Sequence, residues 1–267
     1  HQDFCASGKH REHGIKELDG FMADYVVEDA RNLFLIPRPL RPVGVLLEPL
    51  TIAEKALAEA EKIETRLPWR RTHRRALVLG AGPVGLLGAM KLVHSGFETF
   101  VYSRDPKPNP AASIAASIGA RYISSESVPI DAMREQVGHI DLVYEALGAA
   151  QIAFDVLLRL APNGIYVFTG VPRAAELAPF NTFRTISNLV LSNQAIVGAV
   201  NAGRANYLTG IEDLEAFEQR WPRVLASLIT SRYSLEDFRI PIERRDGIKN
   251  VIDVSGRDML NPNDLSR

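Results

Sequence analysis

Short apolar runs alternate with helix-forming stretches through most of the chain. The apolar runs that predict strands lie at 76–79, 99–102, 122–123, 140–144, 164–168 and 195–200. The stretches that predict helices between them lie at 86–95, 111–118, 130–137 and 149–160. Because strands joined through helices form right-handed crossovers, this alternation predicts an α/β fold with a doubly wound parallel sheet.

The chain before this alternation follows another pattern. Apolar runs at 21–27 and 33–36 predict two short strands, which are too small to hold a core alone. A third apolar run, over 43–47, ends in Glu48, and an amphipathic helix is expected over 50–67. These residues predict a β-rich unit that precedes the sheet.

The end of the chain departs from the alternation as well. A helix is expected near 212–229, and apolar runs follow at 240–242 and 251–254. We expect this part to return to another subdomain rather than to extend the sheet.

The strand predicted at 76–79 leads directly into a glycine-rich turn. Gly80, Gly82 and Gly85 have the G-x-G-x-x-G spacing, and the helix predicted at 86–95 follows. In such a turn the first glycine allows a sharp bend, the second lets a pyrophosphate approach the backbone, and the third lets the helix pack tightly. The N-terminus of the helix also favours negative charge. The motif therefore predicts a dinucleotide site; a glycine turn without a ligand is the alternative.

The residues after the second predicted strand bear on the choice of dinucleotide. An acidic residue about 20 positions beyond the glycine motif favours NAD, whereas an arginine favours the 2′-phosphate of NADP. Arg104 lies nineteen positions after Gly85, between Ser103 and Asp105. A hydroxyl and a guanidinium suit a phosphate, so the sequence favours NADP. Asp105, displaced by one position, leaves NAD as the alternative.

Three further segments lie where predicted strands end, which is where open α/β sheets bind their ligands. They are 145–148, 169–171 and 199–201, and each also has an ordinary interpretation as a turn. The residues predicted to bind the cofactor are Gly80, Gly82, Pro83, Val84, Gly85, Ser103, Arg104, Asp105, Gly148, Thr169, Gly170, Val171, Ala199, Val200 and Asn201.

Composition and charge narrow the function classes. The 267 residues are 46% hydrophobic, and 31 Lys and Arg against 32 Asp and Glu give a net charge of −1. This balance does not favour nucleic acid, and no apolar segment is long enough to span a bilayer. The single cysteine, Cys5, excludes an intrachain disulfide framework. Because the first residues are also polar, we expect no leader peptide and a cytoplasmic protein.

Other candidate chemistry is sparse. Glu48 ends an apolar run and so extends from rigid structure, as a ligand should, but a favourable charge at a helix N-terminus is the alternative. The six histidines show neither H-x-x-x-H nor H-E-x-x-H spacing, and there is no G-x-S-x-G nucleophile motif.

Several short segments carry a resemblance to a known family, namely 3–5, 12–15, 19–22, 47–50, 54–55, 80–85 and 197–201. The most telling are Leu-Glu-Pro-Leu at 47–50 and Val-Gly-Ala-Val-Asn at 197–201. In them the chain resembles the medium-chain, zinc-dependent alcohol dehydrogenase superfamily, and within it the glucose 1-dehydrogenase family of archaea and some bacteria. The resemblance covers almost the whole chain.

The resemblance implies a Rossmann domain with parts of a GroES-like, β-rich catalytic domain on either side. The implied boundaries are 1–66 for the end of the catalytic domain, 67–206 for the NAD(P)-binding domain and 207–267 for the segment that returns to the catalytic domain. The superfamily commonly forms dimers and tetramers, so a homo-oligomer is expected.

The implied activity is transfer of hydride from the carbon that bears the C1 hydroxyl of an aldose to NADP, assisted by zinc. In the family's pattern, Glu48 closes the catalytic zinc shell or holds the substrate beside it, and Glu12 binds sugar hydroxyls unless it is an exposed loop carboxylate. Asn201 lies near the nicotinamide and the sugar, with a turn-forming asparagine as the alternative. Cys5 matches the last cysteine of the structural zinc lobe.

One departure from the family's pattern matters. Members begin with further residues that supply the catalytic Cys and His-Glu ligands, and these have no counterpart here. Because a catalytic zinc needs three protein ligands, we expect no ordered zinc and no glucose oxidation by this chain alone. The alternatives are a truncated or degenerate chain that binds dinucleotide without catalysis, and a polyol, alcohol or threonine dehydrogenase of the same superfamily.

Overall fold

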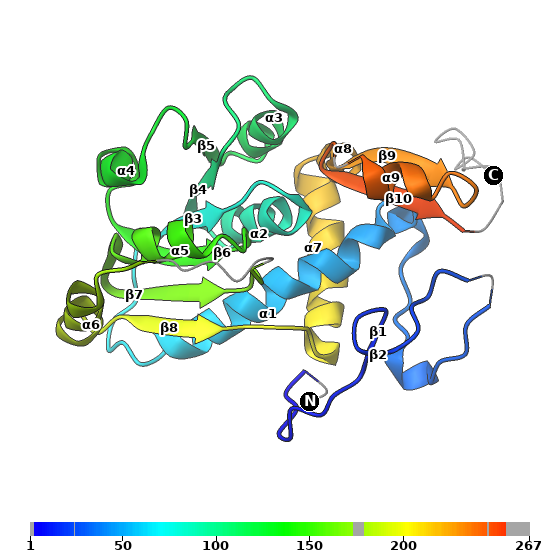
Figure 1. Cartoon of the computed structure of the whole chain (residues 1–267), viewed down its shortest axis with the longest axis horizontal. Helices are drawn as coiled ribbons and strands as arrows, with labels where there is room; N and C mark the ends of the chain where they lie inside the picture. Colours follow the sequence, from blue (N-terminus) through cyan, green and yellow to red (C-terminus); the bar gives the residue numbers. More distant parts are fainter. Residues whose placement is uncertain (1–2, 24, 173–178, 245, 255–267) are drawn as a thin grey trace.

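A six-stranded sheet occupies the centre of the computed structural model, which describes residues 3–23, 25–172, 179–244 and 246–254. In pairing order the strands are β5 (Arg121–Ser124), β4 (Glu98–Ser103), β3 (Arg75–Leu79), β6 (Ile140–Glu145), β7 (Leu160–Phe168) and β8 (Ala195–Gly198). Every neighbouring pair is parallel. This is the 3-2-1-4-5-6 order of a Rossmann sheet, and it confirms the predicted fold class (Figure 1).

Helices cover both faces of the sheet (Figure 1). They are α1 (Leu47–Glu64), α2 (Pro83–His94), α3 (Pro110–Ser117), α4 (Met133–Val137), α5 (Ala150–Leu157), α6 (Thr182–Leu191), α7 (Arg204–Arg220), α8 (Val224–Leu228) and α9 (Arg239–Glu243). Because side chains alternate along a strand, Val78 of β3 packs in the core with α1 and α2, whereas Leu77 packs in a second core with α4 and α5.

Shorter elements lie outside the sheet. They are strands β1 (Glu12–His13), β2 (Glu17–Leu18), β9 (Ile229–Ser234) and β10 (Lys249–Asp253), and 3₁₀ turns η1 (Ala30–Asn32), η2 (Arg38–Leu40), η3 (Gly44–Leu46) and η4 (Ile130–Ala132). The strands β9 and β10 pair in parallel beside α8 and α9, away from the central sheet (Figure 1).

The two strands predicted near the start of the chain are wrong. The described residues of 21–27 and all of 33–36 contain no strand. Their apolar side chains are largely exposed, with Tyr25, Val27 and Leu35 each more than nine-tenths accessible. A strand exists only where a neighbouring backbone completes its hydrogen bonds, and none pairs with these residues in the described structure.

Two predictions about the elements around the sheet also need correction. The apolar run at 43–47 forms η3 and the start of α1 rather than a strand, so Glu48 lies in the first turn of a helix. The helix expected near 212–229 is two helices, α7 and α8, and 240–242 lies in α9. The sequence pattern missed α6 and β9 entirely.

The third predicted segment, 207–267, extends beyond the described residues, since 255–267 lie outside them, and 1–2 of the first segment do so as well. None of the helices in the described part of the chain combines the length and the apolar character that a bilayer span requires.

Candidate active site

The carboxyl ends of β3 and β6 meet where the strand order reverses. These two strands pair side by side, while the chain continues from β3 to β4 in one direction and from β6 to β7 in the other. Open α/β sheets bind ligands in the crevice at such a switch point. Most of the residues predicted to bind the cofactor follow β3, β4, β6, β7 or β8 and so lie at this edge of the sheet.

The glycine turn after β3 has a separate physical reason for each glycine. Gly80 has a φ of +103°, which L side chains rarely adopt, and a Cβ on Gly85 would lie 2.1 Å from the carbonyl oxygen of Gly80. A Cβ on Gly82 would meet nothing within 4 Å. Gly82 is also the N-cap of α2, with no side chain that caps the helix, and Pro83 follows it. The turn therefore presents free N–H groups at a helix N-terminus beside open space, which fits a pyrophosphate.

A buried carboxylate organises the loops after β6 and β7. Glu145 is only 1% exposed, and its side chain accepts hydrogen bonds from the backbone N–H groups of Leu147, Gly148 and Gly170 at 2.7–3.0 Å. The hydroxyl of Thr169 donates to the main-chain oxygen of Glu145 over 2.6 Å. Glu145 thus holds two segments predicted to bind the cofactor, a role that sequence reasoning missed although the strand visibly ends in a carboxylate.

Two glycines let these loops approach each other closely. Gly148 has a φ of +68°, and a Cβ on Gly170 would lie 2.3 Å from the nitrogen of Gly148 and 2.7 Å from the Glu145 carboxylate. Val171 next to them is exposed. The loops therefore form one fixed wall of the crevice, with an accessible apolar side chain at its edge.

The end of β4 has a fixed backbone and an exposed arginine side chain. The Ser124 hydroxyl donates to the main-chain oxygen of Arg104 over 2.8 Å, and the Tyr122 hydroxyl donates to that of Asp105 over 2.8 Å. The Arg104 side chain is 84% exposed and contacts Asp105 only at 3.4 Å. An exposed arginine on a rigid strand end is available to a phosphate, while Asp105 beside it remains available to a ribose hydroxyl.

The end of β8 leads out of the sheet to Asn201. The backbone N–H of Ala199 donates to Phe168 of β7 over 2.9 Å, continuing the ladder beyond Gly198. The carbonyl oxygen of Val200 then accepts a hydrogen bond from Lys55 of α1 over 2.8 Å. Asn201 follows with a left-handed φ of +58°.

The negative charges of Glu12 and Glu48 both act on Tyr207 of α7. Burial raises the pKa of the Tyr207 hydroxyl, and the negative charges of Glu48 and Glu12 raise it further. Glu48 is exposed in the first turn of α1, and Glu12 is half-buried in β1. The Tyr207 ring stacks on that of Phe34 at 4.5 Å, and Glu12, Phe34 and Tyr207 line one groove. Of the predicted substrate residues, Glu12 therefore lies in this groove with Tyr207, whereas Glu48 is not among the described residues that line it.

The predicted zinc ligands do not form a metal site in the described part of the chain. There, no group of three or more His, Cys, Asp and Glu side chains is arranged to hold a metal. Cys5 is exposed, and a hydrogen bond with Ser7 is the largest cause that lowers its pKa. Since zinc needs three or four protein ligands, the described donor set around Glu48 does not fit the ion.

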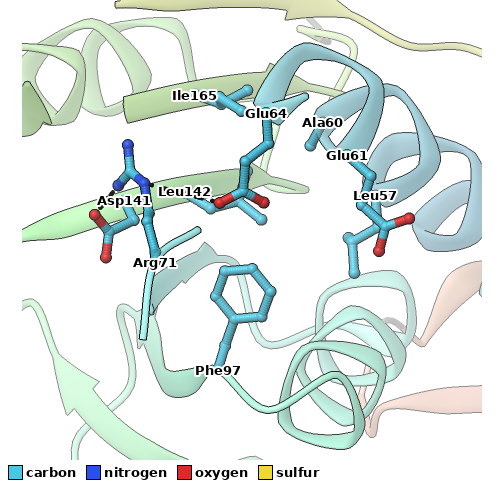
Figure 2. Close-up of a pocket in the computed structure, with 9 residues that line it drawn as sticks. All are labelled: Leu57, Ala60, Glu61, Glu64, Arg71, Phe97, Asp141, Leu142 and Ile165. Carbon is cyan, nitrogen blue, oxygen red and sulfur yellow. Dashed lines mark hydrogen bonds and ion pairs between the residues drawn. The ribbon is translucent and has the colours of Figure 1, made fainter. Parts of the chain in front are cut away.

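A small cavity near the amino ends of the strands, opposite the crevice, has a structural role. Figure 2 shows Arg71 between Asp141, at the amino end of β6, and Glu64, at the end of α1; both pairs are ion pairs. Apolar side chains including Phe97 and Ile165 complete the lining, and the cavity volume of about 20 Å³ accommodates about one water molecule. These contacts join α1 to the sheet far from the strand ends that carry the crevice.

The amino-acid sequence matches a family profile and curated proteins over most of its length. The profile of a family described as "Glucose dehydrogenase C-terminus" matches residues 41–254. Glucose 1-dehydrogenase of Methanocella arvoryzae is 36% identical over 253 residues, which are 94% of this chain and 70% of that protein. Glucose 1-dehydrogenase 2 of Vulcanisaeta moutnovskia is also 36% identical, over 255 residues, with the same coverage.

Solved structures give the same result. Glucose dehydrogenase from Haloferax mediterranei superposes with a TM-score of 0.83 at 28% identity, over 94% of this chain and 70% of that one. One structure of that protein is a complex with NADP, Zn and gluconolactone. At the level of the fold alone, 2R,3R-butanediol dehydrogenase from Bacillus subtilis superposes with a TM-score of 0.66 at 19% identity, over 93% of this chain and 71% of that one. The chain therefore belongs to the glucose dehydrogenase family of the medium-chain, zinc-dependent alcohol dehydrogenase superfamily.

Proposed function

We propose that this protein binds NADP and an aldose for oxidation of the sugar at C1. In that reaction the C1 hydrogen leaves as hydride to C4 of the nicotinamide and the hydroxyl proton is released, so the aldose becomes a lactone and NADP becomes NADPH. The observation that carries the proposal is the crevice at the switch point, where Gly82 leaves open space beside the free N-terminus of α2. Membership of the glucose dehydrogenase family supports the choice of substrate.

Different strand ends bind different parts of the nucleotide. The turn containing Gly80, Gly82 and Gly85, with Pro83 and Val84, takes the pyrophosphate on backbone N–H groups. Ser103 and Arg104 take the 2′-phosphate, and the exposure of Arg104 supports this. The remaining predicted residues line the nicotinamide end, namely Gly148, Thr169, Gly170, Val171, Ala199, Val200 and Asn201.

The sugar lies beside the nicotinamide in this proposal. Glu12 and Glu48 accept hydrogen bonds from its hydroxyl groups, and the position of Glu12 in the groove lined by Phe34 and Tyr207 supports the role of Glu12. Asn201 holds the nicotinamide and one sugar hydroxyl. No step is assigned to a metal, because the described side chains do not fit one.

We further propose that the domain boundaries are 1–66, 67–206 and 207–267. We also propose a cytoplasmic location, in keeping with a single cysteine, and a homo-oligomeric state.

The homo-oligomer is supported by an apolar surface on α6 and the adjacent edge strand β8. This surface includes the exposed side chains of Phe183, Val190, Leu191 and Ile196. Light scattering of the purified protein measures this directly: dimers or tetramers support the proposal, and a monomer contradicts it.

The substrate proposal is tested by binding on the full chain. Saturation-transfer NMR with the NADP-loaded protein compares gluconolactone and glucose with sorbitol and threonine. We expect signals from the lactone and the aldose, which weaken in Glu12→Gln and are absent without nucleotide. Equal signals from sorbitol or threonine would contradict the proposal. Sugar signals that are unchanged in Glu12→Gln and unchanged without NADP would contradict it as well.

A further inference from the structure

Lys55 of α1 is a buried cation whose ammonium group contacts three oxygen atoms. Its side chain is 4% exposed, and Nζ lies 2.8 Å from the main-chain oxygen of Val200, 3.2 Å from that of Asp3, and 3.1 Å from the Asp3 carboxylate. The Phe4 ring centroid lies 4.1 Å from Nζ. An ammonium has three N–H donors, so each is matched by an acceptor. The Asp3 side chain is itself only 6% exposed, so this ion pair is sequestered from water.

The main-chain oxygen of Val200, which accepts the hydrogen bond from Lys55, lies directly before Asn201 in the chain. Beyond Ala199, whose N–H donates to Phe168 of β7, the chain leaves the sheet. The peptide plane that contains the Val200 oxygen also contains the nitrogen of Asn201. A hydrogen bond from Lys55 to this oxygen therefore fixes the plane from which the Asn201 side chain projects.

The backbone of Asn201 needs such a restraint. Its φ of +58° is left-handed, a conformation that asparagine adopts more readily than most residues with a side chain, and that a restraint on the flanking peptide helps to select. On the other side of the turn, at the start of α7, the side-chain oxygen of Asn206 accepts a hydrogen bond from the N–H of Gly203 over 2.9 Å. Lys55 thus holds one side of the turn and α7 holds the other.

We propose that Lys55 is a positioning residue for the nicotinamide end of the site: by holding the Val200 carbonyl, with Asp3 as its counter-ion, it orients Asn201 toward the cofactor. The inference rests on the proposed function, in which Asn201 contacts the nicotinamide. It adds that a helix preceding the Rossmann sheet, and the first residues of the chain, control how well the cofactor's reactive ring is held.

The experiment separates the two ends of the cofactor. Calorimetry compares NADP with adenosine 2′,5′-bisphosphate, which carries the 2′-phosphate but has no nicotinamide, on the full chain and on Lys55→Met. We expect Lys55→Met to weaken NADP by roughly tenfold or more, the equivalent of one charge-assisted hydrogen bond, and to leave the bisphosphate within roughly twofold. Lys62→Met is the matched control, since Lys62 lies on the same helix, 68% exposed and paired with Glu59. It should change neither affinity.

A second variant separates loss of the hydrogen bond from loss of the fold. Lys55→Arg keeps a positive charge and N–H donors, so it should fold and recover most of the NADP affinity lost in Lys55→Met. If Lys55→Met unfolds, Lys55→Gln, which keeps two N–H donors without the charge, takes its place and should also weaken the affinity for NADP but not for the bisphosphate. Equal loss of both ligands, or no loss of NADP in a folded variant, would overturn the inference. Wild-type protein that binds neither ligand would instead contradict the proposed function.

Discussion

Arg104 is the residue on which the choice between NADP and NAD depends. Its side chain is exposed at the end of β4 and its backbone is fixed by Ser124, so it can reach a 2′-phosphate without rearrangement of the strand. Arg104→Ala should lower the affinity for NADP by roughly 10- to 150-fold, since a hydrogen bond to a charged group is worth about 1.5–3 kcal/mol, and should change NAD affinity little. Calorimetric titration with both nucleotides measures this difference.

Asp105→Ala is the control for that prediction. Asp105 lies beside Arg104 and is the alternative reader of the ribose. If Asp105→Ala loses NAD while Arg104→Ala leaves NADP unchanged, the site prefers NAD and the assignment of Arg104 is wrong.

Single residues were predictable from the sequence where the reason is local. The glycine turn is such a case, because its spacing directly follows a strand and precedes a helix. The role of Lys55 was missed because its hydrogen bond joins positions that are close only in the folded chain: Lys55 and Val200 are 145 residues apart. Glu145 bonds locally to Leu147 and Gly148, but its bond to Gly170, which ties the two loops together, spans 25 residues and has no local signal. The roles of Glu12, Glu48 and Asn201 stay predictions, since the contacts among the described residues place them without showing a ligand.

At the level of elements, the parallel strands were predictable because burial on both faces produces continuous apolar runs. The runs at 21–27 and 33–36 have similar composition, but strand formation depends on a partner that the local pattern does not reveal. Helix α1 was anticipated from its amphipathic pattern, yet it begins at Leu47 rather than Leu50, so Glu48 moved from a strand end into a helix.

Three helices are joined by a buried charge cluster. Glu54 of α1 is 3% exposed and lies 2.9 Å from Lys91 of α2, which also pairs with Asp213 of α7. Burial, together with the neighbouring Asp213, raises the pKa of Glu54 to about 8 despite the opposing charge of Lys91. Burial also raises the pKa of the hydroxyl of Tyr144 in β6, and the charges of Glu145 and Glu54 raise it further.

This cluster predicts a pH dependence of stability. Between the ordinary pKa of 4.5 and about 8, the folded protein keeps a proton on Glu54 that the unfolded chain releases. The free energy of unfolding should therefore fall as pH rises through this window, by at most about 1.4 kcal/mol per pH unit from this group. Urea denaturation at several pH values should show a shallower slope for Glu54→Gln. An identical slope in the variant would exclude Glu54 as the cause.

At the scale of the whole molecule, stability should be unevenly distributed. Apart from the Asp3 side chain, no described residue between 3 and 39 is buried, whereas 76–79 and 142–145 lie wholly in the core. Segments with few buried contacts open locally at low free energy. Hydrogen exchange should therefore be fast across 3–39 and slow at 76–79 and 140–144. Strong protection of residues 3–39 would contradict this prediction.

The central claim is that the chain binds NADP in the crevice at the switch point of the sheet. The most direct measurement is a calorimetric titration of wild-type protein and Gly82→Val with NADP, with thermal unfolding recorded for each. Because the space beside Gly82 is open, the variant should unfold at the wild-type temperature. Its new side chain occupies the place of the pyrophosphate, so its NADP affinity should fall by roughly tenfold or more. Equal NADP affinity in a folded Gly82→Val variant, or no NADP binding by the wild type, would contradict the account.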